Sequence, residues 1–225
     1  MSEIRKSELR KILLKTVGVT KNEAKLTENF WSDLSQSTDL TDEFIREFKD
    51  KLNWDVISVH QKLSETFLTE FSERINWEYI SLHQKLSEEF IRKFKHKVDW
   101  YHISEYQKLT EGFIREFQDK LDWYNISKEQ TLSEEFIREF QNRVNWHGVS
   151  SYQNLSETFL SEFSDRINWR WYFYRQEASF PFIKKYILTA KNVNLLEIKI
   201  THLTDSQKRE IARIYSLKNV FVNKS

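Results

Sequence analysis

Residues 63–85 read LSETFLTEFSERINWEYISLHQK, and residues 86–108 repeat the same pattern as LSEEFIRKFKHKVDWYHISEYQK. Seven of the eight tryptophans of the chain are spaced 23 residues apart, without any insertion. They are Trp31, Trp54, Trp77, Trp100, Trp123, Trp146 and Trp169. A fixed short period is typical of tandem-repeat proteins, in which each unit packs only on its neighbours. The sequence therefore predicts five complete units, preceded by half a unit around Trp31.

Each unit contains two signals for the start of a helix. The first is a serine or threonine after a leucine, with isoleucine or leucine four residues past it, as at Ser64 and Leu68. This is the spacing of a hydrophobic staple around an N-cap. The second signal is the Asn or Asp directly before each repeat tryptophan, such as Asn76. Because these caps alternate 12 and 11 residues apart, we expect two helices of roughly two to three turns and almost no loop.

Both predicted helices carry a single buried stripe. In the first helix, it consists of Phe67, Leu68, Phe71 and Ile75, at i, i+1, i+4 and i+8. In the second helix, Trp77, Ile80, Ser81 and Gln84 lie at i, i+3, i+4 and i+7. Polar groups on a buried stripe need partners, so we expect the recurrent Ser and Gln to hydrogen-bond backbone ends between repeats. The tryptophans are predicted to form a core ladder rather than stacking platforms for nucleic-acid bases. The predicted fold class is an all-α, right-handed α-solenoid of short helix pairs, capped at both ends.

The chain divides into three predicted parts. Residues 1–30 form N-terminal capping helices, residues 31–176 form the solenoid, and residues 177–225 form a C-terminal cap. This cap contains a degenerate repeat and a final helix at about 205–217, with residues 219–225 frayed. The solenoid carries 19 basic and 26 acidic side chains, whereas both ends are basic. Alternating charges within it, such as Arg46 and Glu47, indicate a solvated outer face.

The composition excludes several classes of protein. Without cysteine there is no disulfide framework and no thiolate metal site. The sequence has no apolar run long enough for a bilayer and no apolar leader, so we expect an intracellular protein without membrane segments. The chain has only three glycines and no Gly-rich phosphate-binding loop. It also has no nucleophile motif and no recurring acid–base pair. We therefore expect no enzymatic activity and no cofactor. His60 and His83 lie one period apart, but no third ligand recurs beside them, so no metal site is predicted.

The candidate site is the face of the second helix that points away from the buried stripe. It comprises the positions one, two, five and six residues after each repeat tryptophan, which differ from copy to copy. Tyrosine and histidine concentrate there, and such side chains bury large areas at low entropic cost while keeping a polar group. The predicted partner-binding residues are His60, Tyr79, His83, Tyr101, His102, Tyr106, Tyr124, His147 and Tyr152. The alternative is that this face packs on the first helices of the adjacent repeat.

The segment 168–175 (NWRWYFYR) is aromatic on every side. A helix that is apolar all round is usually buried, which here means beneath the C-terminal cap. The alternative is an exposed binding hot spot.

The unit L-S-E-E-F-I-R-x-F-x-x-x-V-x-W-x-x-I-S-x-x-Q resembles the short Trp/Phe helical repeat proteins of large DNA viruses of protists. The resemblance covers about residues 31–176, and that family has no established activity. It implies a viral protein made in a host cell, located in the host cytoplasm or the virion, acting as a host-interaction adaptor or virion component. It supplies no site residues.

The sequence thus predicts a non-enzymatic protein–protein interaction scaffold whose partner is a host or viral protein. One alternative is a nucleic-acid-binding repeat protein, which the acidic solenoid disfavours because phosphate charge dominates such binding. A second alternative is a structural element that self-associates, since the ends of a solenoid expose apolar faces unless they are capped.

Overall fold

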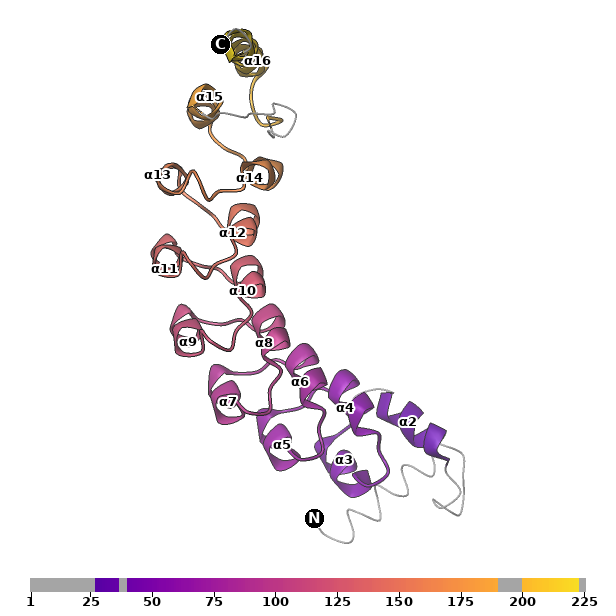
Figure 1. Cartoon of the computed structure of the whole chain (residues 1–225). Coiled ribbons are helices and arrows are strands. Elements are labelled where there is room, and N and C mark those ends of the chain that lie inside the picture. The colour runs from indigo at the N-terminus through magenta and orange to yellow at the C-terminus, as the bar shows by residue number, and fades with distance from the viewer. Residues whose placement is uncertain (1–26, 37–39, 190–199, 223–225) are drawn as a thin grey trace. The chain divides into compact units, whose positions relative to one another are not determined.

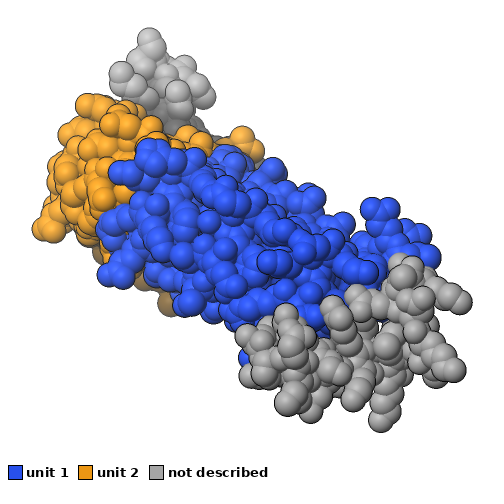
Figure 2. Space-filling view, turned by 90° about the horizontal axis from the view of Figure 1, so that it is seen from below, with its two compact units in different colours: residues 1–109 blue, residues 110–225 orange. Residues whose placement is uncertain are grey.

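The computed structural model describes residues 27–36, 40–189 and 200–222, and these residues form helices and connecting turns without a β-strand (Figure 1). The predicted N-terminal capping helices lie outside the described residues, apart from residues 27–30. The helices fall into two compact units, residues 1–109 and residues 110–225 (Figure 2).

Each repeat contributes two helices, as the sequence predicts. The first helices are α3 (Asp42–Phe48), α5 (Glu65–Glu70), α7 (Glu88–Lys93), α9 (Glu111–Glu116), α11 (Glu134–Glu139) and α13 (Glu157–Glu162). The second helices are α2 (Glu28–Gln36), α4 (Trp54–His60), α6 (Trp77–His83), α8 (Trp100–Tyr106), α10 (Trp123–Glu129), α12 (Trp146–Tyr152) and α14 (Trp169–Arg175). Two further helices, α15 (Phe180–Thr189) and α16 (Asp205–Val222), follow them. Within each unit the first helices form one layer and the second helices the other, so the solenoid of helix pairs is confirmed (Figure 1).

Both predicted caps begin helices. The Ser64 hydroxyl accepts a hydrogen bond from the Phe67 amide (3.2 Å), and the Asn76 side chain accepts from the Glu78 amide (3.1 Å). The same two caps recur through both units, ending with Ser156 and Asn168. Each cap satisfies amides that the first turn of a helix leaves unpaired.

The helices are shorter than two to three turns, and the connections are longer than expected. α5 has six residues and α6 has seven, with residues 71–76 between them. Phe71 leaves helical geometry at φ −108°, and the chain then makes another turn in which the Arg74 amide donates to the Phe71 carbonyl (2.8 Å). This turn brings Ile75 back to the core, where 6% of its surface stays exposed. The predicted apolar stripe is therefore correct, but a helix and a turn carry it together.

The tryptophans join consecutive repeats. The Trp54 ring lies 5.0 Å from the Phe71 ring and 6.4 Å from the Phe67 ring of the next repeat, measured between centroids. The prediction of a core ladder needs one correction, because every repeat tryptophan after Trp31 is only half-buried. The polar edge of the indole explains this position, since Trp77 Nε1 donates to the Ser72 carbonyl (2.9 Å) at the rim of the core.

The recurrent serines and glutamines bond backbone groups between consecutive repeats, as predicted. The Ser58 hydroxyl donates to the Trp54 carbonyl (2.7 Å) and accepts from the Asn76 amide (3.1 Å). Gln84 Oε1 accepts from the Leu63 amide (3.2 Å), while its Nε2 donates to the carbonyls of Ser58 (3.1 Å) and Gln61 (2.8 Å). Gln107 and Gln153 repeat this arrangement, each within its own unit, and we call these residues the glutamine ladder.

Charged side chains also fasten consecutive first helices to one another. The Arg46 guanidinium lies 5.2 Å from the centroid of the Phe67 ring of the next repeat, and its Nη2 is 2.9 Å from Glu70 Oε2. Arg115 and Arg138 do the same with Glu139 and Glu162. We call this arrangement the arginine clasp. The predicted solvent-exposed face is therefore correct for these charges, and neighbouring repeats in addition supply their partners.

The C-terminal end of the array continues the pattern with different residues. α15 takes the place of a first helix, since Ser179 caps it and the Trp169 ring packs on Phe182 (5.9 Å) and Tyr186 (4.5 Å). α15 packs in turn on α16. This last helix runs to Val222, five residues past the predicted end at about 217.

Candidate protein-binding surface

Most recurrent residues of the repeat have structural roles, so only a small set of residues remains as candidates for function. The recurrent Trp, Phe, Ser and Gln, the helix caps and the arginine clasps all bond within or between repeats. The positions one, two, five and six after each tryptophan vary in sequence, and we treat them in two pairs.

After the tryptophans from Trp54 to Trp146, positions two and five are buried or half-buried, whereas Tyr174 at position five of α14 is exposed. Tyr79 and His102 at position two are half-buried, whereas Asn125 and Gly148 at the same position are buried. Gly148 shows how close the contact is, because a Cβ atom there would lie 3.0 Å from Ser127 Cβ of the preceding second helix. The neighbours are second helices, since α4 packs on α6, α6 on α8, α10 on α12 and α12 on α14. Packing on the first helices, the alternative that the sequence left open, is not what occupies these positions.

Positions one and six are largely open to solvent. Tyr101 and Tyr124 at position one expose 54% and 47% of their surface, and Tyr106 and Tyr152 at position six expose 52% and 40%. His60 and His83 at position six are also exposed, and His147 at position one is half-buried. The name tyrosine surface covers two sets of exposed side chains, Tyr101 with Tyr106 and Tyr124 with Tyr152. Two of its members lie in each unit.

In the first unit the predicted site residues gather mainly on α8. The His102 ring lies 5.5 Å from the Tyr101 ring, edge to face, and 6.1 Å from the Tyr106 ring. His102 Nδ1 is 3.1 Å from Asp99 Oδ1 without forming a hydrogen bond, and Asp99 Oδ1 accepts from the His102 amide (2.9 Å). On α6 the rings of Tyr79 and His83 are farther apart, at 6.4 Å.

In the second unit Tyr152 is surrounded by cations that the sequence reasoning missed. Lys128 Nζ lies 5.8 Å from the centroid of the Tyr152 ring, and the Arg175 guanidinium lies 5.1 Å from it. Arg175 Nη2 also donates to the Tyr152 hydroxyl (3.3 Å). The signal was available, because Lys128 and Arg175 occupy positions five and six after their tryptophans. The prediction missed them because it was restricted to tyrosine and histidine.

The aromatic helix α14 is buried on one side only. Tyr172 and Phe173 are 5% and 1% exposed, which agrees with burial under the C-terminal helices. Tyr174 is 65% exposed, however, and Arg175 lies 5.9 Å from its ring centroid. The prediction of full burial is therefore wrong for this residue. Desolvation of the buried phenol raises the pKa of Tyr172 to about 12, so it stays protonated.

The two cations near Tyr152 differ in whether an acidic side chain pairs with them. Glu129 pairs with Lys128 at 2.7 Å, and this hydrogen bond raises the pKa of the Lys128 ammonium above its usual value. Arg175 forms no ion pair with any described residue, and the two tyrosine rings are its neighbours. A surface of this kind, with exposed phenol rings beside cations, binds partners through aromatic contact and hydrogen bonds.

Two kinds of feature are absent from the described residues. They contain no group of three or more His, Asp or Glu side chains arranged to hold a metal ion. Among the helices in residues 27–36, 40–189 and 200–222, none has the length and apolar character that crossing a membrane requires.

The chain was compared with protein-family models, curated proteins and solved structures. None of these matches it, so the candidate surface rests on its own geometry.

Proposed function

We propose that this protein is a non-enzymatic scaffold that binds another protein through the tyrosine surface. The observation that carries the proposal is the exposure of four tyrosines, at 40–54%, at positions that differ from copy to copy of the repeat. Tyrosine is favoured at binding surfaces because its ring is large, rigid and amphipathic. The resemblance to viral repeat proteins favours a host or viral protein as the partner.

The charge of the array supports a protein partner over a nucleic acid. Residues 31–176 carry 26 acidic and 19 basic side chains, and such an excess repels phosphate. Several arginines are also engaged by neighbouring repeats, as Arg115 is by Glu139, which leaves fewer cations for a backbone contact.

The proposal is tested by comparing the proteins that two variants retain from a cell lysate. In the first variant the four tyrosines of the tyrosine surface are changed to alanine. In the control variant, four exposed residues from the links between helices are changed to alanine: Lys62, Lys85, Lys108 and Thr131. Circular dichroism checks that both variants keep the helical content of the original protein.

We expect the control to retain the partners of the original protein and the tyrosine variant to lose at least one of them. The partner that is lost is then purified, and its binding to the original protein is measured directly. If the tyrosine variant retains the same set of proteins as the control, the tyrosine surface is not the binding site.

A further inference from the structure

The junctions between consecutive first helices are of two kinds. In the first kind an arginine clasp crosses the junction, as Arg138 does between α11 and α13. In the second kind a short hydroxyl side chain replaces the arginine. These residues are Thr69 at the α5–α7 junction and Ser161 at the α13–α15 junction.

The residue types at both clasp positions differ between the two kinds of junction, and they change together. Where the arginine is present, the residue 24 positions later is glutamate, as in Arg46 and Glu70 or Arg138 and Glu162. Where the hydroxyl residue is present, the residue 24 positions later is lysine, namely Lys93 after Thr69 and Lys185 after Ser161. Two coordinated replacements at each of two junctions indicate a second, distinct type of junction.

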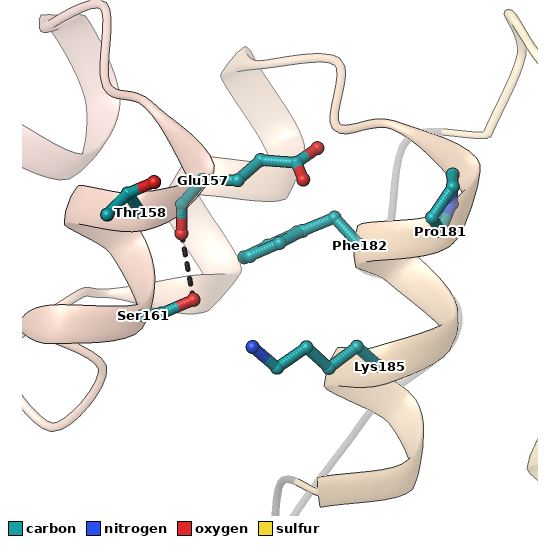
Figure 3. Close-up of a pocket in the computed structure, with 6 residues that line it drawn as sticks. All are labelled: Glu157, Thr158, Ser161, Pro181, Phe182 and Lys185. Atoms are coloured by element: carbon teal, nitrogen blue, oxygen red, sulfur yellow. Dashed lines mark hydrogen bonds between the residues drawn. The ribbon is translucent and has the colours of Figure 1, made fainter.

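A solvent-open pocket lies at each junction of the second kind. The pocket between α5 and α7 has a volume of about 360 Å³, and the pocket between α13 and α15 has about 410 Å³. The first is lined by Glu65, Thr66, Thr69, Glu89, Phe90 and Lys93. The second is lined by Glu157, Thr158, Ser161, Pro181, Phe182 and Lys185, which occupy the same six repeat positions (Figure 3).

The phenylalanine in each pocket lacks the arginine side chain that packs on the corresponding phenylalanine at the clasp junctions. Phe136 and Phe159 are 0% exposed beneath the guanidinium groups of their clasps. Phe90 and Phe182 keep 4% and 6% exposure. In Figure 3 the Phe182 ring and the Lys185 chain both extend from α15 toward α13, where Ser161 lies.

The remaining polar groups are partly engaged and partly available. In the α5–α7 pocket, the Glu65 carboxylate accepts from the Ser87 amide (2.5 Å) and hydroxyl (2.9 Å). Lys93 Nζ lies 3.4 Å from Thr69 Oγ1, and its ammonium is also 5.2 Å from the Phe94 ring centroid. The pocket is thus lined by one aromatic ring, one ammonium group, two hydroxyl groups and two carboxylates.

The arginine clasp shows what kind of group this space accepts. It places a flat, delocalised group over the phenylalanine at 4.9–5.2 Å. A cationic guest would lack the ion-pair partner that the clasp arginine has, because lysine stands in both pockets where the clasp has glutamate. A carboxylate guest is disfavoured in the α5–α7 pocket because Glu65 and Glu89 outnumber Lys93. A neutral flat ring suits both pockets, since it stacks on phenylalanine and receives the ammonium on its face.

We infer that each pocket binds an aromatic side chain presented by a segment of a partner protein. The threonine and serine hydroxyls would bond the phenol of a tyrosine or the indole N–H of a tryptophan. This goes beyond the proposed function, because the pockets lie between first helices and the tyrosine surface lies on second helices. Either surface can fail its test while the other passes.

The test uses the full chain and small probes of defined chemistry. N-acetyltyrosinamide is titrated into isotope-labelled protein while the NMR signals of the threonine methyl and phenylalanine ring groups are followed. N-acetylleucinamide, N-acetylargininamide and N-acetylglutamic acid amide serve as comparison probes of aliphatic, cationic and anionic character. For so small a probe we expect a dissociation constant of about 1 mM.

Three double variants make the test specific. Thr69→Arg with Lys93→Glu installs an arginine clasp at the first pocket, and Ser161→Arg with Lys185→Glu does so at the second. Because the clasp occurs naturally in this chain, these changes are compatible with the fold. Arg138→Thr with Glu162→Lys makes the reverse change and is expected to create a third pocket.

We expect saturable shifts at Thr69, Phe90 and Phe182 with the tyrosine probe. Each clasp variant should weaken the probe at its own pocket by about tenfold or more, since it removes the stacking face and the cation. The reverse variant should add shifts around Phe159. Binding of the tyrosine probe that is no tighter than that of the leucine, arginine or glutamate probes would overturn the inference. So would pocket signals that move with protein concentration alone, because the occupant would then be a second copy of the chain.

Discussion

Replacing Gln84 with methionine removes one rung of the glutamine ladder while keeping the volume of the side chain. The native amide accepts one hydrogen bond from the Leu63 amide and donates two, to the Ser58 and Gln61 carbonyls. Only 8% of Gln84 is exposed, so water has little access to the groups that lose their partner. Methionine fills the space but leaves these three backbone groups without a hydrogen bond.

The expected loss follows from this count. An unpaired buried backbone group costs about 1 kcal/mol at the low end of the measured range, so three of them cost about 3 kcal/mol. Gln176 provides a matched control at the end of the array. It is half-buried, and its bonds to the Ser151 and Gln153 carbonyls are both 3.4 Å long. We expect Gln176→Met to cost less than about 1 kcal/mol, because those bonds are weak and water can replace them.

Urea denaturation of both variants gives the two free energies of unfolding. Amide hydrogen exchange adds a local measurement, in which the Leu63 amide should lose protection in Gln84→Met and keep it in Gln176→Met. Equal losses of stability in the two variants would contradict the reasoning. A protected Leu63 amide in Gln84→Met would do the same, because the ladder would then not be what binds that amide.

Three further predictions concern other contacts between and within repeats. Gly148→Ala should destabilise the protein by about 1–3 kcal/mol in urea denaturation, because the new Cβ lies 3.0 Å from a side chain on α10. At Gly112 the nearest atom to a new Cβ is 3.8 Å away, so Gly112→Ala should be neutral or stabilising by up to about 1 kcal/mol. Equal effects of the two alanines would be inconsistent with close helix contact at the first site. Trp123→Phe should cost about 1–2 kcal/mol in the same assay, since it removes the 2.9 Å bond from the indole to a backbone carbonyl, and an unchanged midpoint would contradict that role. Glu134 is expected to make the protein sensitive to acid. Burial alone would raise the pKa of Glu134, but hydrogen bonds from Ser156 and the nearby arginine outweigh it and lower the pKa. The stabilisation by Glu134 is therefore present above the ordinary glutamate pKa of about 4.3, and it is lost as the pH falls through the lower pKa of Glu134 in the folded protein. Glu134→Gln lacks this titrating group, so the variant should lose less stability than the original protein between neutral and acidic pH.

The sequence predicted the helix pairs well because their determinants are local. A cap such as Ser64 and an aliphatic residue four positions past it define a helix start without knowledge of the fold. The glutamine ladder was also predictable, since a polar residue on an otherwise apolar stripe must find partners. The break at Phe71 was not, because the same apolar spacing fits either a longer helix or a helix followed by a turn.

The arginine clasps and the pockets depend on how repeats stack, so spacing within one unit did not reveal them. Arg46 and Glu70 lie 24 residues apart, and nothing local relates them. The signal exists only when the copies are aligned with one another, because arginine then accompanies glutamate while Thr69 and Ser161 accompany lysine. The exposure of Tyr174 was missed for a related reason, since a helical wheel cannot show which side of an aromatic helix the C-terminal helices leave uncovered.

The glutamine ladder also bears on how such a gene can change. Every rung joins a glutamine to backbone groups of the repeat before it, and the receiving groups are the same in each copy. Recombination that adds or removes a whole repeat therefore keeps the glutamines in register with their backbone partners. An insertion of any other length would shift the donors away from their acceptors and break the register at once. The chemistry of the rungs thus favours evolution by duplication of whole units, after which the exposed positions of each copy can diverge.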